Sequence, residues 1–281
     1  MEVVEGGVYR RSISLHGHDG YFEATCDPDN DTLSVRIHFG DPRSLFVVIE
    51  RIRAMFDLNA DPAEIARCLV GDPALAERIN AAPGIRVPGC WNGFELAVRT
   101  ILGQQISVKG ATTLAGRLAT KFGRTFSGPS GLTHFFPPAE VLADANVAVI
   151  GLPKARAQTI QALARAVRDR QISFEGIVDT DSFRDQLCTI PGIGKWTAEY
   201  VTMRALREPD AFPSSDLGLL RALGLKRASE FERRAEAWRP WRAYAAMYFW
   251  SAGRSQRDAS GNQRLLIGRT SKQQDAHAMS L

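Results

Sequence analysis

The sequence predicts a mostly α-helical protein with a small α+β lobe at its N-terminal end. Two observations support this fold class. Residues 9–15, 21–26 and 32–39 are rich in β-forming side chains and are separated by turn-forming residues, which predicts three antiparallel strands. From residue 61 to residue 250 the apolar residues instead recur at helical spacing.

One helix completes the N-terminal lobe, which we expect to span residues 1–60. Residues 43–56 are amphipathic, and five apolar residues share one face, namely Leu45, Val48, Ile49, Ile52 and Met55. Three strands alone leave a sheet edge whose backbone groups are unpaired, which is a liability.

Residues that favour the beginnings and ends of helices divide the helical region into separate helices. Asp61 and Pro62 open a short helix as N-cap and first-turn proline. A long helix that contains Phe94 and Ile101 is broken by Gly103-Gln104-Gln105, and Ser107 caps the next helix. Beyond a loop over residues 123–138, we expect helices at about 139–144 and 154–170, a helix pair at about 182–207, a helix after Asp216 and a last helix at 239–250.

Composition restricts the class of protein. The 281 residues suffice for one or two domains, and no apolar run is long enough to span a bilayer or act as a signal peptide, so we expect a cytoplasmic protein. The four cysteines, Cys26, Cys68, Cys90 and Cys188, lack metal-ligand or disulfide spacing and are interpreted as reduced thiols.

The net charge of +4 is concentrated at the C-terminal end. Residues 251–281 contain five arginines and lysines and two aspartates, or +3 of the total. We expect this polar segment to be a disordered basic tail. Because little net charge remains elsewhere, the charge of the whole chain argues only weakly for nucleic-acid binding.

The segment Leu187 to Tyr200, LCTIPGIGKWTAEY, is the most informative part of the chain. Pro191 to Gly194 forms a tight turn between two apolar-periodic segments, and glycine lets another molecule approach the backbone closely. The turn also opens a helix, whose unpaired N–H groups and dipole attract phosphate. Such a helix-hairpin-helix grips a nucleic-acid backbone without reading the base sequence.

Five segments together resemble one family. They are PGIGKWTAEY (191–200), Asp216, WRPWRAYAAMYFW (238–250), ILGQQIS (101–107) and GLPKARAQTI (151–160). They are similar to the helix-hairpin-helix DNA glycosylases, and most similar to the 3-methyladenine DNA glycosylase II (AlkA) type. The resemblance covers residues 9 to 250 and implies two helical lobes around a cleft. Relatives carry further elements before the first strand, so the chain is naturally short, has a mis-set start, or is the C-terminal part of a fusion.

The resemblance implies a repair activity on duplex DNA. The expected reaction is hydrolysis of the N-glycosidic bond of alkylated, cationic purines such as 3-methyladenine and 7-methylguanine, which leaves an abasic site. Asp216 matches the catalytic aspartate of the family. A carboxylate stabilises the oxocarbenium character of the sugar and orients or deprotonates the attacking water. The alternative role for Asp216 is a helix N-cap, and both roles can coexist. The competing Asp210 is expected to be solvated in a turn.

Trp196 indicates how the bond is broken. Relatives that also cut the strand have a lysine at this position, which attacks the sugar and forms a Schiff base. Lys195 is adjacent, but one residue along a helix turns the side chain by about 100°. We therefore expect Lys195 to face phosphate, water to be the nucleophile, and strand-cleaving lyase activity to be absent.

Three aromatic residues are candidates for binding the base. Trp196 and Tyr200 are four residues apart and share a helix face. Trp250 matches the third aromatic residue of the family's cleft. Aromatic faces attract a cationic base by stacking and by cation–π interaction. The alternative is that these rings are simply part of the core.

The remaining site residues follow from the family's mode of DNA binding. Gln104 and Gln105 match the loop that fills the gap left by a flipped nucleotide, although some relatives have leucine where Gln105 stands. Gly192, Gly194 and Thr197 match positions that hold the DNA backbone. The resemblance also implies a monovalent cation, Na⁺ or K⁺, at the carbonyl oxygens of Cys188, Ile190 and Ile193. Side-chain metal ligands and an iron–sulfur cluster are not expected.

Two other functions remain open from the sequence. The same fold could remove another lesion, such as an oxidised purine or uracil. A helix-hairpin-helix can also be a non-catalytic DNA-binding module, which needs neither an acid at residue 216 nor an aromatic cleft. In each case the expected partner is double-stranded DNA, damaged DNA for the enzymes, and a monomer suits the resemblance.

Overall fold

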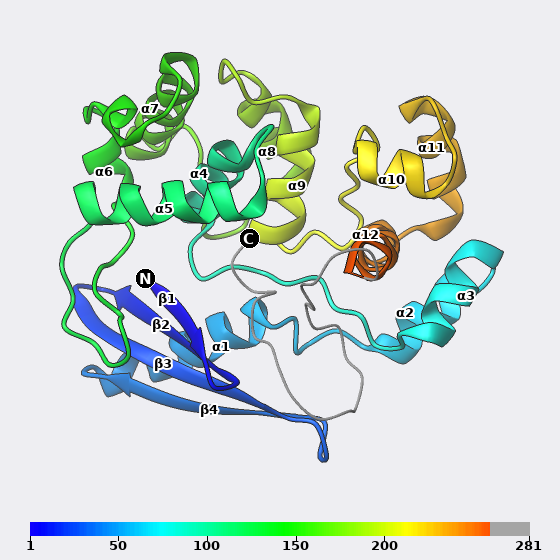
Figure 1. Ribbon diagram of the computed structural model, residues 1–281, viewed down its shortest axis with the longest axis horizontal. Coiled ribbons are helices and arrows are strands. Elements are labelled where there is room, and N and C mark those ends of the chain that lie inside the picture. The colour runs from blue at the N-terminus through cyan, green and yellow to red at the C-terminus, as the bar shows by residue number, and fades with distance from the viewer. Residues whose placement is uncertain (259–281) are drawn as a thin grey trace.

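The computed structural model describes the backbone of residues 1–258 and the side chains of residues 1–251. It begins with an antiparallel sheet in the order β1-β2-β3-β4 (Figure 1). The strands are β1 (Glu2–Glu5), β2 (Val8–Leu15), β3 (His18–Asp27) and β4 (Thr32–Phe39). The expected count of three strands is therefore wrong. β1 pairs with β2, with Val4 opposite Tyr9, and covers the edge that three strands would leave open. Its sequence, EVVE, is short and does not alternate, so it carries little strand pattern.

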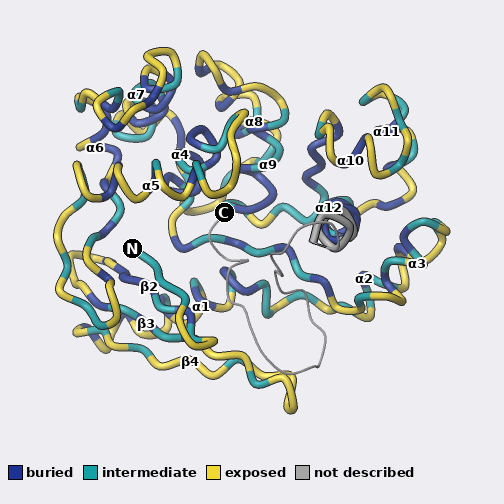
Figure 2. Tube along the Cα trace, viewed as in Figure 1, coloured by how far each residue is buried: buried dark blue, intermediate teal, exposed yellow. Residues whose placement is uncertain are grey.

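The sheet packs one face against α1 (Leu45–Met55), which follows the short helix η1 (Pro42–Ser44). Tyr9, Ile13 and Phe22 from the sheet meet Val48 and Ile52 from α1 in one hydrophobic core. Leu45 and Ile49, which were expected on the buried face, are exposed. Figure 2 shows β4 as a largely exposed edge strand.

The remaining helices form two lobes with separate hydrophobic cores. The first lobe contains α4 (Gly93–Gly103), α5 (Val108–Phe122), α6 (Ala139–Leu142), η2 (Val147–Ile150), α7 (Lys154–Arg168), α8 (Thr180–Cys188) and α9 (Lys195–Ala205). The second lobe contains α2 (Pro62–Leu69), α3 (Pro73–Ala81), α10 (Leu217–Ala222), α11 (Ala228–Ala235), η3 (Glu236–Trp238) and α12 (Arg242–Asp258). In Figure 1 the first lobe lies above the sheet and the second lies beside it. The chain crosses between the lobes after α3 and again after α9.

Local start residues act as the sequence predicts. Asp61 caps α2 by accepting hydrogen bonds from the backbone N–H groups of Ala63 and Glu64, and Ser107 caps α5 by accepting from Gly110. The turn between α4 and α5 falls at Gln104, as expected. The Ser107 cap fixes the end of the turn that carries the two glutamines.

The last helix differs from the expectation at both ends. α12 begins at Arg242 and continues to Asp258, whereas the sequence predicts a helix over 239–250. Arg239 instead precedes Pro240, which has no N–H to donate to a helix. The expected disordered tail over residues 251–281 therefore overlaps α12, and residues 259–281 lie outside the described part of the chain. Across residues 1–258, no helix is both long and apolar enough to cross a membrane.

Candidate active site

The helix-hairpin-helix is α8, a turn over residues 189–194, and α9. Ile190 and Ile193 are buried in the core of the first lobe and anchor the turn. The Ile193 N–H donates to the Ile190 carbonyl at 3.0 Å. Gly192 has a left-handed φ of +91°, and a Cβ there would lie 2.2 Å from Thr159 Oγ1 of α7. Only glycine fits at this position.

Gly194 is different from Gly192. It is the N-cap of α9, with an ordinary φ of −99°, and a Cβ built on it meets no atom within 4 Å. The side of Gly194 on which a Cβ would lie is therefore open, at the start of a helix. Open backbone at a helix N-terminus is what close contact with a phosphate needs.

Asp216 lies at the junction of the two lobes, as the N-cap of α10. Its Oδ1 accepts hydrogen bonds from the Leu219 N–H at 2.9 Å and from Trp250 Nε1 at 3.1 Å. Its Oδ2 accepts from Trp196 Nε1 at 2.8 Å. The capping role weighed from the sequence is therefore present, and the half-buried carboxylate is held by three neutral donors.

The three expected base-binding residues lie together around this carboxylate. The rings of Trp196 and Tyr200 are stacked, with centroids 5.3 Å apart and planes at 10°. Tyr200 and Trp250 meet edge to face at 6.1 Å. All three rings are half-buried, whereas Trp238, interpreted as a packing residue, is 1% exposed. Partial exposure at a junction between lobes favours a binding role over a core role for the three rings.

Asp210, the competing carboxylate, was expected to be solvated, but in the structure it is paired with two arginines. It accepts hydrogen bonds from Arg242 Nε at 2.8 Å and Arg242 Nη2 at 2.9 Å, and it also pairs with Arg239. Its side chain is 16% exposed. Two arginines neutralise Asp210, whereas no ion pair with Asp216 occurs among the described side chains of residues 1–251.

The structure separates the two glutamines of the α4–α5 turn. Gln104 Nε2 donates to the Gly192 carbonyl and to Thr197 Oγ1, each at 3.1 Å. Gln105 is exposed and has a left-handed φ of +59°. Gln104 thus faces the hairpin. Thr197, expected to contact DNA, is 4% exposed and meets Gln104 instead.

Lys195 lies on the exposed side of the hairpin. Its side chain is 79% exposed, and its Nζ is 3.9 Å from Glu232 Oε1. An exposed ammonium at the first residue of α9 is available to a phosphate group.

Two further residues that the sequence analysis did not single out support the site. Arg204 is 7% exposed, and it donates from Nη1 to the Tyr200 hydroxyl at 2.6 Å and from Nε to the Pro88 carbonyl at 2.8 Å. Glu199 accepts from the Phe212 N–H at 3.0 Å, and burial raises the pKa of this carboxyl. Arg204 fixes Tyr200, and Glu199 fixes the connection that leads to Asp216. The four-residue spacing of Tyr200 and Arg204 is the one local sign of these contacts.

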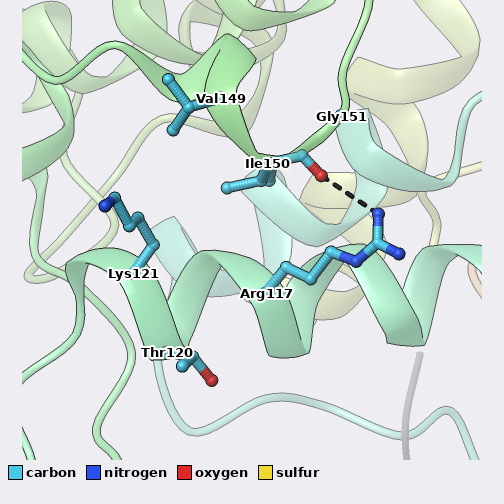
Figure 3. A pocket seen from close by; sticks show the side chains of 6 residues that line it. All are labelled: Arg117, Thr120, Lys121, Val149, Ile150 and Gly151. Carbon is cyan, nitrogen blue, oxygen red and sulfur yellow. Dashed lines mark hydrogen bonds between the residues drawn. The ribbon is translucent and has the colours of Figure 1, made fainter.

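A surface hollow of about 600 Å³ lies elsewhere, between α5 and η2 (Figure 3). Its lining is Arg117, Thr120, Lys121, Val149, Ile150 and Gly151. Arg117 donates to the Ile150 carbonyl at 3.3 Å. The hollow contains neither a carboxylate nor an aromatic ring, so it lacks the groups that the expected chemistry needs.

Side-chain metal ligands do not gather within residues 1–258. The part of the chain that the structure describes has no group of three or more His, Cys, Asp or Glu residues that could hold a metal ion. All four cysteines are unpaired thiols.

Comparison with known sequences shows the family. Residues 98–242 match the model of the HhH-GPD superfamily base excision DNA repair proteins, and residues 1–92 match the AlkA N-terminal domain. The chain belongs to the HhH-GPD superfamily of base excision DNA repair proteins, with an N-terminal domain of the AlkA kind.

Individual relatives agree with this assignment. The probable bifunctional transcriptional activator/DNA repair enzyme AlkA of Mycobacterium tuberculosis is 40% identical over 256 residues, which cover 89% of this chain but 51% of the relative. The chain thus spans about half the length of that protein. DNA-3-methyladenine glycosylase 2 of Escherichia coli is 30% identical over 254 residues, covering 89% of this chain and 87% of the relative. The structure of the 3-methyladenine DNA glycosylase from Archaeoglobus fulgidus superposes with a TM-score of 0.75 at 25% identity, over 90% of this chain and 89% of the other.

Proposed function

We propose that this chain is a DNA glycosylase that hydrolyses the N-glycosidic bond of alkylated purines in duplex DNA, such as 3-methyladenine and 7-methylguanine, and leaves an abasic site. One observation carries the proposal. Asp216 is held by three neutral N–H donors beside three half-buried aromatic rings, and it has no ion-pair partner among the described side chains, those of residues 1–251. The names of the relatives favour alkylated bases over other lesions.

The arrangement suits a reaction in which positive charge develops. Neutral donors fix the carboxylate without cancelling its charge, so the charge remains to stabilise an oxocarbenium-like sugar. The surrounding rings attract a cationic purine through their electron-rich faces. Such a base is already a good leaving group, so little acid catalysis is required.

Water is the proposed nucleophile. Position 196 is a tryptophan whose indole N–H is bound to Asp216, so it offers no amine to attack the sugar. Lys195 is exposed on the hairpin beside Glu232. We therefore propose a monofunctional enzyme without strand-cleaving lyase activity. Asp216 orients or deprotonates the water.

The hairpin is proposed to hold the DNA backbone. The open backbone at Gly194 and the ammonium of Lys195 bind phosphate, while exposed Gln105 fills the space of the flipped nucleotide. The carbonyls of Cys188, Ile190 and Ile193 are neutral oxygen donors of the kind that suits Na⁺ or K⁺, and a cation there would bridge to phosphate. We expect the protein to act as a monomer.

The two hairpin glycines test this mode of binding. Gly194→Ala is expected to leave the melting temperature unchanged, because the new Cβ meets no protein atom within 4 Å. It should weaken binding of all DNA sequences alike by about tenfold, since backbone contacts carry no base information and one charge-assisted hydrogen bond contributes about 1.5–3 kcal/mol. Gly192→Ala is the contrasting variant, because its Cβ would clash with Thr159 and lower the melting temperature. A loss of binding at Gly194 that depends on base sequence would contradict the proposal.

The decisive test of the activity is to incubate the protein with methylated duplex DNA and to identify the released base by chromatography and mass spectrometry. Release of 3-methyladenine or 7-methylguanine is the expected result, with the strand intact until heat or alkali is added. Release only from uracil- or 8-oxoguanine-containing duplexes would favour the same fold with another specificity. Binding without release of any base would identify a non-catalytic DNA-binding module.

A further inference from the structure

The side chain of Gln104 joins the α4–α5 turn to the hairpin. Gln104 donates one amide N–H toward the Gly192 carbonyl and the other toward Thr197 Oγ1, each at 3.1 Å. Thr159 Oγ1 of α7 donates to the neighbouring Pro191 carbonyl at 2.8 Å. The hairpin is therefore held from two sides, by α7 and by the turn that precedes α5.

The backbone conformation of Gln105, the next residue, is fixed by the residues on either side of it in the chain. No side-chain hydrogen bond of Gln105 occurs among the side chains that the structure describes, residues 1–251, and its φ of +59° lies in the left-handed region that side-chain-bearing residues rarely adopt. Such a conformation persists only where the surroundings fix it. Gln104 anchors the residue before it, and the Ser107 cap on α5 anchors the chain two residues after it.

We propose that Gln104 is a positioning residue that locks the Gln105 turn to the hairpin. The hairpin, which binds the DNA backbone, and Gln105, which fills the gap left by the flipped nucleotide, then form one rigid unit. This inference rests on the proposed function. The Gly192 carbonyl and the open backbone of Gly194 belong to the same turn, so the Gln104 amide sets where Gln105 lies relative to the gripped phosphates. Without that amide the hairpin still binds DNA, but Gln105 is no longer presented at a fixed place.

The test separates nucleotide extrusion from DNA binding. The probe is a duplex in which 2-aminopurine, whose fluorescence rises when it leaves the stack, stands beside a stable abasic-site analogue. Gln104→Met keeps the length of the side chain and removes the amide. The fluorescence rise and the release of alkylated base from duplex DNA are expected to fall by about tenfold, the loss expected for ordinary hydrogen bonds. Affinity for undamaged duplex and the melting temperature are expected to be retained.

A double-mutant cycle with Gln105→Ala gives the sharper result. Because Gln104 acts through Gln105, the double variant should give the same rise in 2-aminopurine fluorescence as Gln105→Ala alone. Thr197→Ser should extrude like the wild type because it keeps the hydroxyl acceptor, whereas Thr197→Val should lose part of the fluorescence rise. If Gln104→Met does not fold, Gln104→Asn gives the same comparison, since its amide is too short to reach the hairpin.

Three results would overturn the inference: wild-type extrusion by Gln104→Met, additive losses in the cycle, or equal losses of extrusion and of binding to undamaged duplex. The wild-type protein serves as the control for the proposed function itself. If it releases no base from methylated duplex, the proposed function fails. If it releases base while Gln104→Met extrudes normally, only the inference fails.

Discussion

The protein holds buried charge in two different ways. Where the sheet meets α4, acids and bases neutralise one another. Arg11 Nη1 lies 2.8 Å from Glu2 Oε2, Arg99 Nε lies 3.0 Å from Glu95 Oε1, and Arg11 also pairs with Glu95. At the junction of the helical lobes, the hydrogen bonds that Asp216 accepts from the described residues, 1–251, come from the neutral N–H groups of Trp196, Leu219 and Trp250.

The difference separates structural charge from functional charge. Burial alone would raise the pKa of Glu2, but Arg99 and Arg11 outweigh it and lower this pKa to about 2. In this cluster each carboxylate faces an arginine, so its charge is used within the protein. Under the proposed function, Asp216 instead lies beside rings that favour cations, where its carboxylate faces a reacting sugar without a described ion-pair partner.

The largest expected effect on stability is at the balanced cluster. Glu95→Gln removes the charge that faces Arg11 and Arg99, whose side chains are 7% and 11% exposed. Breaking a buried pair leaves an uncompensated charge and costs about 3–5 kcal/mol in the free energy of unfolding. Chemical denaturation of the two proteins measures this difference.

A matched surface pair is the control for that measurement. Glu175 pairs with Arg51 at 2.7 Å, but its side chain is 72% exposed. Glu175→Gln should change the free energy of unfolding by less than about 1 kcal/mol, because exposed ion pairs contribute little. If both substitutions lower the free energy of unfolding by the same amount, the buried cluster at the sheet stabilises the protein no more than an exposed ion pair does.

Asp210 extends the comparison to two neighbouring carboxylates. Asp210→Asn removes the charge that faces Arg239 and Arg242, so we expect a loss of about 1.5–3 kcal/mol in the free energy of unfolding, the range for hydrogen bonds to charged groups. Base release by the folded variant should match the wild type, because Asp210 is already neutralised. A large fall in release below the melting temperature would place Asp210 in the reaction and would weaken the contrast with Asp216.

Trp250→Phe sharpens the role of the neutral donors. The substitution keeps an aromatic face but removes the indole N–H that reaches Asp216 Oδ1 at 3.1 Å. We expect kcat to fall by about tenfold, the size expected for one hydrogen bond to a charged acceptor, with a smaller change in KM. Single-turnover and steady-state kinetics on one methylated duplex distinguish the two constants. A change confined to KM would mean that Trp250 binds the base without orienting the acid.

Local sequence features predicted most of the fold and the outline of the site. The caps at Asp61 and Ser107, the turn at Gln104 and the hairpin at Gly192 depend on neighbouring residues, so spacing and residue type suffice to find them. β1 was missed because its four residues show no alternation. The predicted start of α12 is too early because Arg239 precedes a proline. The predicted end is also too early because the sequence becomes polar after Trp250.

Contacts between distant segments could not be predicted. Gln104 meets the hairpin, Arg204 meets Pro88, and Asp210 meets Arg242 only after the helices have packed. From the sequence, Glu95 is an ordinary acidic residue near the start of a helix. In the structure it is 4% exposed and paired with arginines. Pattern and spacing give the faces of single elements, but not which elements meet.

We propose that the carboxylate of Asp216 drives the reaction. Asp216→Asn tests it most directly, because an asparagine can still cap α10 and so preserves the local fold. Release of 7-methylguanine from a methylated duplex should fall by about 10²–10⁴-fold, the contribution typical of a positioned carboxylate, while affinity for the same duplex is retained. Release at the wild-type rate by the folded variant would contradict the account.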